Sequence, residues 1–465
     1  MIIQTFILLI YQFFMFGQWY LLGKEVDNRL KIYYRVNSTM DRFLYRIIVG
    51  NLLSTSLFAL IAYLGNEDLI NIFYWSFFVI VGLFYSWPTR GKIVEESVSS
   101  QFKEFRFLDS FEKNILILTI TFFIFSLPEL PLFSNVEALK LYLDPQELLS
   151  GQLWNFLKVL YSPFSSYSSF YTLAICLHIY VVGLSFFLIS LYCFLRYFIS
   201  RRLAILGLFA FISTWSFTKI IHVNFLSIYS STFILIWLWS MLWVRYSSTY
   251  RSGFFLGLIS YFAVLLNANN IVLFFLSLLL TYFLFSEDRT RWYKNQLIKY
   301  TFFGLVLSLT VLVQHYNFSF THHYSRLGFI DELAKYANEK SFYRIAYLGL
   351  FLLPMSYLKK FKKMFFRVTF NKEMLWIMLC FLFFSFVCDV YFGLNLYTRF
   401  GVVWILVFLS LLPLEWIFQS ITRLRNRRNM IYVFYALVLL LDSHFDQRVR
   451  IVIKSIVEND YSTIF

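Results

Sequence analysis

The sequence predicts an all-α protein that crosses a membrane many times. Hydrophobic residues make up 59% of the 465 residues and charged residues only 14%, whereas soluble domains are nearer half apolar and a quarter charged. Apolar stretches of about 17–25 residues recur along the whole chain, and helices of that length cross roughly 30 Å of hydrocarbon. Because lipid offers no partners for backbone groups, such stretches are expected to form helices.

The order of the apolar stretches predicts about fourteen spans. A basic residue flanks residues 253–286 on each side (Arg251 and Arg289), so this region is expected to form a hairpin. Residues 1–112 are expected to be an N-terminal three-helix membrane segment, and residues 113–465 the main transmembrane domain. The expected spans are residues 2–22, 47–64, 69–87, 114–133, 168–195, 203–218, 225–244, 253–267, 271–286, 299–316, 343–358, 374–393, 401–420 and 429–442.

The basic residues orient these spans. Most of the 41 lysines and arginines lie in or beside every second loop. Cytoplasmic loops carry such an excess of positive charge, so both termini are expected on the opposite, non-cytoplasmic side. The expected location is the inner (plasma) membrane of a bacterium. The basic residues of these loops account for the net charge of +15, and they are expected to attract anionic lipid. No nucleic-acid partner is therefore expected. The basic loops are residues 24–46, 88–113, 196–202, 245–252, 287–298, 359–373 and 421–428.

Two loops on the non-cytoplasmic side are large, residues 134–167 and 316–342. The first has apolar residues at three- and four-residue spacing, which predicts helices lying in the membrane interface. It carries Glu137, Asp144 and Glu147. A carboxylate shielded by protein and lipid can act as a general base. We therefore expect Glu137 to be catalytic, with Asp144 and Glu147 next; the competing interpretation is that all three are solvated loop acids.

Several residues on the same face are candidates for binding an anion. Arginine suits phosphate because its planar group donates two parallel hydrogen bonds, and Arg399 directly precedes an expected span. The competing role for Arg399 is an interfacial anchor. The other predicted phosphate- or substrate-binding residues are Lys340, Arg344, Arg326, Lys219, His222 and Asn224.

The sequence indicates neither a metal site nor a nucleotide cofactor. It contains no His-Glu-x-x-His motif, no Asp-x-Asp pair in the outer loops and no glycine-rich phosphate loop. The four cysteines all lie in or at the ends of apolar stretches without metal-ligand spacing, so they are expected to be small core residues. They are Cys176, Cys193, Cys380 and Cys388.

The order of several short motifs carries more information than any one of them. Glu137 is followed by Gly151 and then by Tyr161-Ser-Pro163-Phe. Later come the polar hairpin tip at residues 267–270 and Tyr397-Thr-Arg399-Phe, which leads into a helix. From about residue 113 onward this order resembles the GT-C superfamily of membrane glycosyltransferases. The branch it resembles most is that of the protein mannosyltransferases and the lipid A aminoarabinose transferase.

The chain departs from the pattern of that superfamily at two positions. Val136 stands where relatives carry the first acid of a pair, and Asn224 stands where relatives carry another acid.

The resemblance implies a GT-C-like helical bundle and a sugar-transfer reaction. A polyprenyl-phosphate sugar would enter from the lipid, with its phosphate held by Arg399 and by Lys340 or Arg344. Glu137 would take the proton from an acceptor hydroxyl as that hydroxyl attacks the anomeric carbon with inversion. The partners would be membrane lipids and the lipid-linked sugar. Once cations neutralise the departing lipid phosphate, it needs no general acid, and no cofactor is implied.

Three other functions remain open. A transporter or flippase of lipid-linked oligosaccharide is compatible with many spans, although transporters often have internal repeats and helices broken by glycine or proline. This chain has only 16 Gly and 7 Pro. A polysaccharide polymerase is expected to have outer loops richer in arginine. A non-catalytic membrane subunit is compatible with the 59 Phe and 33 Tyr.

Overall fold

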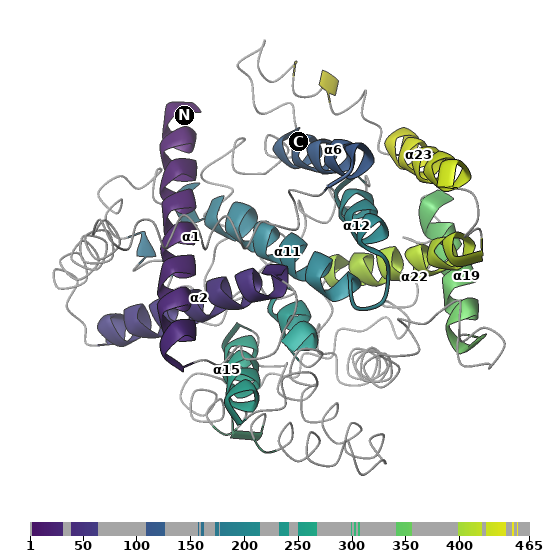
Figure 1. Ribbon diagram of the computed structural model, residues 1–465. Coiled ribbons are helices and arrows are strands. Elements are labelled where there is room, and N and C mark those ends of the chain that lie inside the picture. The colour runs from purple at the N-terminus through teal and green to yellow at the C-terminus, as the bar shows by residue number, and fades with distance from the viewer. Residues whose placement is uncertain are drawn as a thin grey trace, which may run out of the picture.

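The structure of the protein is a computed structural model (Figure 1). Within the described residues every regular element is a helix, which confirms the all-α class. The described residues are 2–30, 39–63, 108–125, 157, 160–161, 173–175, 177–213, 232–240, 250–266, 299, 302–303, 306, 341–355, 399–420, 425–442, 449–450 and 453.

The helices α15, α19, α22 and α23 follow their predicted spans to within about four residues, whereas the predicted spans 69–87, 271–286 and 374–393 lie outside the described residues. The helices are α1 (Ile2–Leu30), α2 (Thr39–Tyr63), α6 (Ser110–Phe125), the π-helix η3 (His178–Val182), α11 (Gly183–Leu195), α12 (Arg201–Ser213), α15 (Tyr250–Leu266), α19 (Ser341–Met355), α22 (Arg399–Ser420) and α23 (Arg425–Asp442).

Two helical stretches are long and apolar enough to cross a membrane, Phe6–Asp27 and Leu173–Leu195. They differ in their surroundings, because 33% of the first is buried and 76% of the second. Shorter apolar helices lie within α19, α22 and α23. The number of fourteen spans therefore stays a prediction.

The helices α1 and α2 form an antiparallel pair whose backbones touch. A Cβ atom added at Gly23 would collide with the backbone of Arg46, and one added at Gly50 would collide with the backbone of Trp19. Small residues allow this close approach of two helices. Gly17 on the same helix has no neighbouring atoms at that position, so the requirement for glycine is local to the contact.

The prediction that residues 24–46 form one loop is wrong at both ends of that range. Helix α1 continues to Leu30 and α2 already begins at Thr39. The reason is pairing: Asp27 Oδ2 accepts hydrogen bonds from Arg46 Nε at 2.9 Å and from Arg42 Nε at 3.2 Å. Charged residues that find partners across a helix pair stay helical and buried, whereas hydropathy alone assigns them to a loop.

Helices α6 and α12 lie side by side and run in the same direction. Glu112 pairs with Arg201 near the start of both helices. Farther along, the ring of Phe122 packs edge-on against Phe209 with 5.5 Å between centroids.

Helix α22 contacts α12 and runs in the opposite direction (Figure 1). The backbone N–H of Ser200, just before α12, donates to Glu415 near the end of α22 at 3.1 Å. Gly207 of α12 lies against Leu411, nearer the start of α22. Trp404 of α22 also contacts Phe194 of α11.

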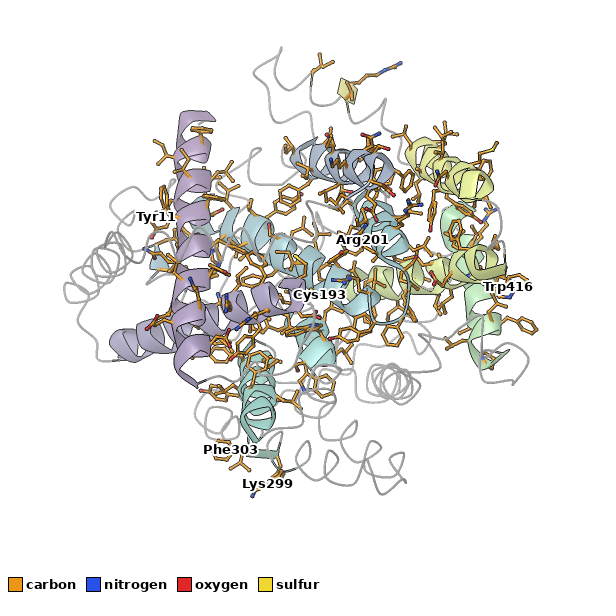
Figure 2. All side chains as sticks on the ribbon, viewed as in Figure 1. Tyr11, Cys193, Arg201, Lys299, Phe303 and Trp416 are labelled. Carbon is orange, nitrogen blue, oxygen red and sulfur yellow. The ribbon has the colours of Figure 1, made fainter. Side chains whose placement is uncertain are left out.

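The core at this crossing is aromatic and aliphatic. Trp404 and Phe408 are buried there and pack against Phe194. Cys193 is also buried, close to the centre of the bundle (Figure 2), as predicted for a small core residue. The other three cysteines lie outside the described residues.

Candidate functional site

Two of the predicted site residues fall within the described residues. Arg344 lies in the first turn of α19 with an exposed side chain, and Arg399 is the first residue of α22. The other predicted site residues lie outside the described residues. They are Glu137, Asp144, Glu147, Lys219, His222, Asn224, Arg326 and Lys340.

The helices that carry Arg344 and Arg399 are in direct contact, and Figure 1 shows α19 crossing α22. A Cβ atom at Gly349 would collide with the backbone of Leu409. At the helical rise per residue, Arg399 lies about 15 Å from Leu409 along α22, and Arg344 about 7 Å from Gly349 along α19. That both arginines bind one phosphate stays a prediction, now placed on two neighbouring helices.

Three neutral polar side chains meet in the interior of the bundle; we call Gln12, Tyr161 and His178 the His178 cluster. Gln12 Nε2 donates to the hydroxyl of Tyr161 at 3.2 Å. That hydroxyl lies 2.9 Å from His178 Nδ1, and the direction of the hydrogen bond depends on the tautomer of the ring. All three side chains are buried. The cluster joins α1, Tyr161, whose backbone N–H donates to the carbonyl of Leu157 at 3.1 Å, and the π-helix η3.

Aromatic rings surround the His178 cluster. Trp19 packs edge-on against the ring of His178, with 5.9 Å between centroids. Tyr11 packs against Tyr161 at 5.8 Å, and its hydroxyl donates to the carbonyl of Leu160 at 3.2 Å. The cluster thus combines a few polar atoms with aromatic walls, as small-molecule sites commonly do.

Sequence analysis did not single out the His178 cluster. Gln12 and His178 each lie within an apolar stretch. Polar residues inside predicted spans are costly and are commonly functional, and this signal was available in the sequence. Which helix faces meet is a property of the fold, however, so the contact between these two residues and Tyr161 required coordinates.

A second set of polar residues is charged and lies at or near the ends of helices; we call Asp27, Arg46, Asp41, Glu112 and Arg201 the charged layer. Glu112 accepts two hydrogen bonds from Arg201, one on each carboxylate oxygen and both 2.9 Å long. This bidentate geometry is the strong form of the arginine–carboxylate pair.

Glu112 also caps the N-terminus of α6. Its backbone N–H donates to Asp109 Oδ1 at 2.8 Å, and the backbone N–H of Asp109 donates to Glu112 Oε2 at 3.0 Å. Such reciprocal caps satisfy the free N–H groups at a helix start. Next to them, Arg202 pairs with Asp109 and donates to Asn429 of α23 at 3.1 Å.

Asp41 links α2 to two other parts of the bundle. Trp239 Nε1 donates to Asp41 Oδ1 at 3.0 Å, and the hydroxyl of Tyr197 donates to Oδ2 at 3.2 Å. Burial raises the pKa of the Asp41 carboxyl, while these hydrogen bonds, one from Cys193 and the nearby charge of Arg196 oppose the shift.

The two regions differ in the chemistry they allow. In the charged layer, the carboxylates accept hydrogen bonds from arginine, tryptophan and tyrosine, although Asp27 Oδ1 has no donor among the described residues. The His178 cluster offers uncharged donors and acceptors, which suits a neutral polar ligand. Among the described residues, no group of three or more His, Cys, Asp or Glu side chains is arranged to hold a metal ion.

No family model, curated protein or solved structure matches the chain.

Proposed function

We propose that the protein is an integral membrane glycosyltransferase that moves a sugar from a polyprenyl-phosphate donor to an envelope acceptor on the non-cytoplasmic face. Glu137 accepts the proton of the acceptor hydroxyl while the oxygen of that hydroxyl bonds to the anomeric carbon. The bond from that carbon to the phosphate oxygen breaks, and the lipid phosphate departs against Arg399 and Arg344. Inversion at the anomeric carbon follows from this single displacement.

Exposed apolar side chains support the placement in a membrane. Phe6 and Phe13 project from α1 at helical spacing, and Phe13 is 79% exposed. Helix α23 presents a similar stripe that includes Phe434 and Leu441. Large exposed apolar patches mark membrane or protein contacts. Since they lie on helices at different places in the bundle (Figure 2), surrounding lipid accounts for them together.

Helix directions support the predicted orientation. The alternation of basic loops predicts that α1 and α2 are antiparallel, that α6 and α12 are parallel, and that α12 and α22 are antiparallel. The contacts of the described helices agree with all three directions. The charged layer therefore collects helix ends that are all predicted to face the cytoplasm.

The observation that carries the proposal is the contact of α19 with α22. Each of these helices has an arginine in its first turn, at positions 344 and 399, and each is predicted to begin at the non-cytoplasmic face. Arginines in the first turns of neighbouring helices are suited to neutralising one lipid phosphate.

The test is transfer of radiolabelled sugar from polyprenyl-phosphate carriers in membrane vesicles. Glu137→Gln and Arg399→Ala are each expected to lower the rate at least about a hundredfold, because each removes a group that acts in the transition state. Glu25→Gln and Arg42→Ala make the same chemical changes at the end of α1 and in α2. These two controls are expected to keep their activity; full activity in Glu137→Gln and Arg399→Ala contradicts the proposal.

The His178 cluster favours a second candidate, a flippase of lipid-linked oligosaccharide. Its side chains are polar groups inside the bundle, beside a π-helix at residues 178–182, and transporters place substrate sites at irregular helices in the bundle interior. Movement of the intact lipid-linked sugar across vesicles, without formation of a glycosidic bond, identifies the flippase.

A further inference from the structure

The amide oxygen of Gln12, in the His178 cluster, has no hydrogen-bond partner among the described residues. Gln12 is only 2% exposed, yet its Oε1 accepts no hydrogen bond from them. A buried acceptor left without a donor destabilises the folded protein. A group carrying a proton is therefore expected beside this oxygen.

The orientation of the Gln12 amide is fixed by its neighbours. Nε2 donates to the carbonyl of Ala174 at 3.3 Å as well as to the hydroxyl of Tyr161. If the amide were turned around, Oε1 would face the carbonyl oxygen of Ala174 with no proton between them. The unpartnered atom is thus an acceptor, and the missing group is a donor.

The surroundings indicate what kind of donor fits. The polar partners shown at the site are an amide, a phenol and an imidazole, and the rings of Trp19 and Tyr11 pack beside them. The site begins at a π-helix, an irregularity that is frequent at functional sites. Neutral donors and acceptors between aromatic rings suit the hydroxyl groups of a sugar better than they suit a phosphate.

We propose that the His178 cluster binds a hydroxyl group of the sugar on the lipid-linked substrate, with Gln12 Oε1 accepting the hydrogen bond from that hydroxyl. This inference rests on the proposed function. It separates two tasks: Arg344 and Arg399 bind the phosphate, and the His178 cluster selects the sugar. A buried water molecule supplies the same O–H donor, so the experiment must separate the sugar from water.

The experiment measures binding to the full chain in lipid nanodiscs. The probes are a panel of short-chain polyprenyl-phosphate hexoses and the same lipid phosphate without a sugar. The wild type is expected to bind at least one sugar-bearing lipid more tightly than the bare lipid phosphate. Gln12→Leu and Tyr161→Phe are each expected to reduce that preference about tenfold, as the loss of one hydrogen bond implies, and to leave affinity for the bare lipid phosphate unchanged.

Gln18→Leu is the matched control, because Gln18 is a half-buried glutamine on the same helix. It is expected to bind both probes as the wild type does. Tyr161→Phe keeps the aromatic ring and removes only the hydroxyl. It therefore keeps the test decisive if Gln12→Leu does not fold.

The outcomes separate this inference from the proposed function. If the wild type prefers a sugar-bearing lipid and both variants keep that preference, the cluster holds water only and this inference alone is overturned. If the wild type binds neither kind of lipid, the proposed function is overturned together with it.

Discussion

The charged layer and the His178 cluster are both buried and polar, yet they satisfy their polar atoms in different ways. In the charged layer, Asp27 and Glu112 meet arginines, and the Asp41 carboxylate is held by Trp239 and Tyr197. In the His178 cluster, uncharged groups meet one another and Gln12 Oε1 has no partner among the described residues. Each region also holds a buried acceptor without a donor among the described residues, Asp27 Oδ1 in the charged layer and Gln12 Oε1 in the His178 cluster. Such an acceptor therefore does not mark a site by itself, and the His178 cluster differs from the charged layer because its polar groups are uncharged.

The largest effect on stability is expected when one charge is removed from the charged layer. Arg46→Ala leaves Asp27 buried with Arg42 as its remaining arginine partner. Removing one partner of a buried ion pair costs about 3–5 kcal/mol, so unfolding of the detergent-solubilised protein is expected at a clearly lower temperature. The Arg42 side chain is 42% exposed, so Arg42→Ala is expected to cost at most about 1 kcal/mol. Equal effects of the two variants contradict a structural role for the buried pair.

The close contact of α1 with α2 places Asp27 beside Arg46, and it can be tested by adding one methyl group. Gly23→Ala forces the two backbones apart and is expected to cost about 1–3 kcal/mol of stability. Gly17→Ala is the control, because open space surrounds that position. It is expected to be neutral or to stabilise α1 by up to about 1 kcal/mol. Thermal unfolding of both variants measures the difference, and a harmless Gly23→Ala means that the backbones do not touch.

The pH dependence of stability tests whether the buried Asp41 of the charged layer titrates above its ordinary pKa. Because burial raises the pKa of Asp41 above its ordinary value of 3.8, the folded protein binds a proton more tightly than the unfolded chain does. The contribution of this group to stability is therefore largest at low pH and declines as pH rises through the raised pKa.

Asp41→Asn removes this dependence, since the amide does not titrate. The difference in unfolding temperature between the wild type and Asp41→Asn, followed from pH 4 upward, is expected to shift in favour of the variant. A difference that is constant with pH contradicts the raised pKa.

Much of the fold was predictable from hydropathy and charge. The predicted span 401–420 corresponds to α22 (Arg399–Ser420), and 253–267 corresponds to α15 (Tyr250–Leu266). The errors lie where charged residues are helical. Helix α2 begins eight residues before its predicted span, because a local pattern cannot show that Asp41 and Arg46 have partners on other elements.

The candidate site was less predictable than the fold. Arg344 and Arg399 were named as single cations near helix starts, but the contact of Gly349 with Leu409 depends on packing between helices that are distant in sequence. The His178 cluster depends on the same kind of information, since Gln12 and Tyr161 lie 149 residues apart. The role of Glu137 stays a prediction from the sequence, because it lies outside the described residues.

The most direct test of the proposed orientation is the side of the membrane on which the charged layer and the starts of α19 and α22 lie. Single cysteines are introduced by Arg42→Cys, Arg202→Cys, Arg344→Cys and Arg399→Cys, with the four native cysteines replaced, and are labelled with a membrane-impermeant maleimide. Positions 344 and 399 are expected to label in intact cells, and positions 42 and 202 only in inverted vesicles. Labelling of all four positions from the same side would contradict the proposed membrane orientation and, with it, sugar transfer at the non-cytoplasmic face.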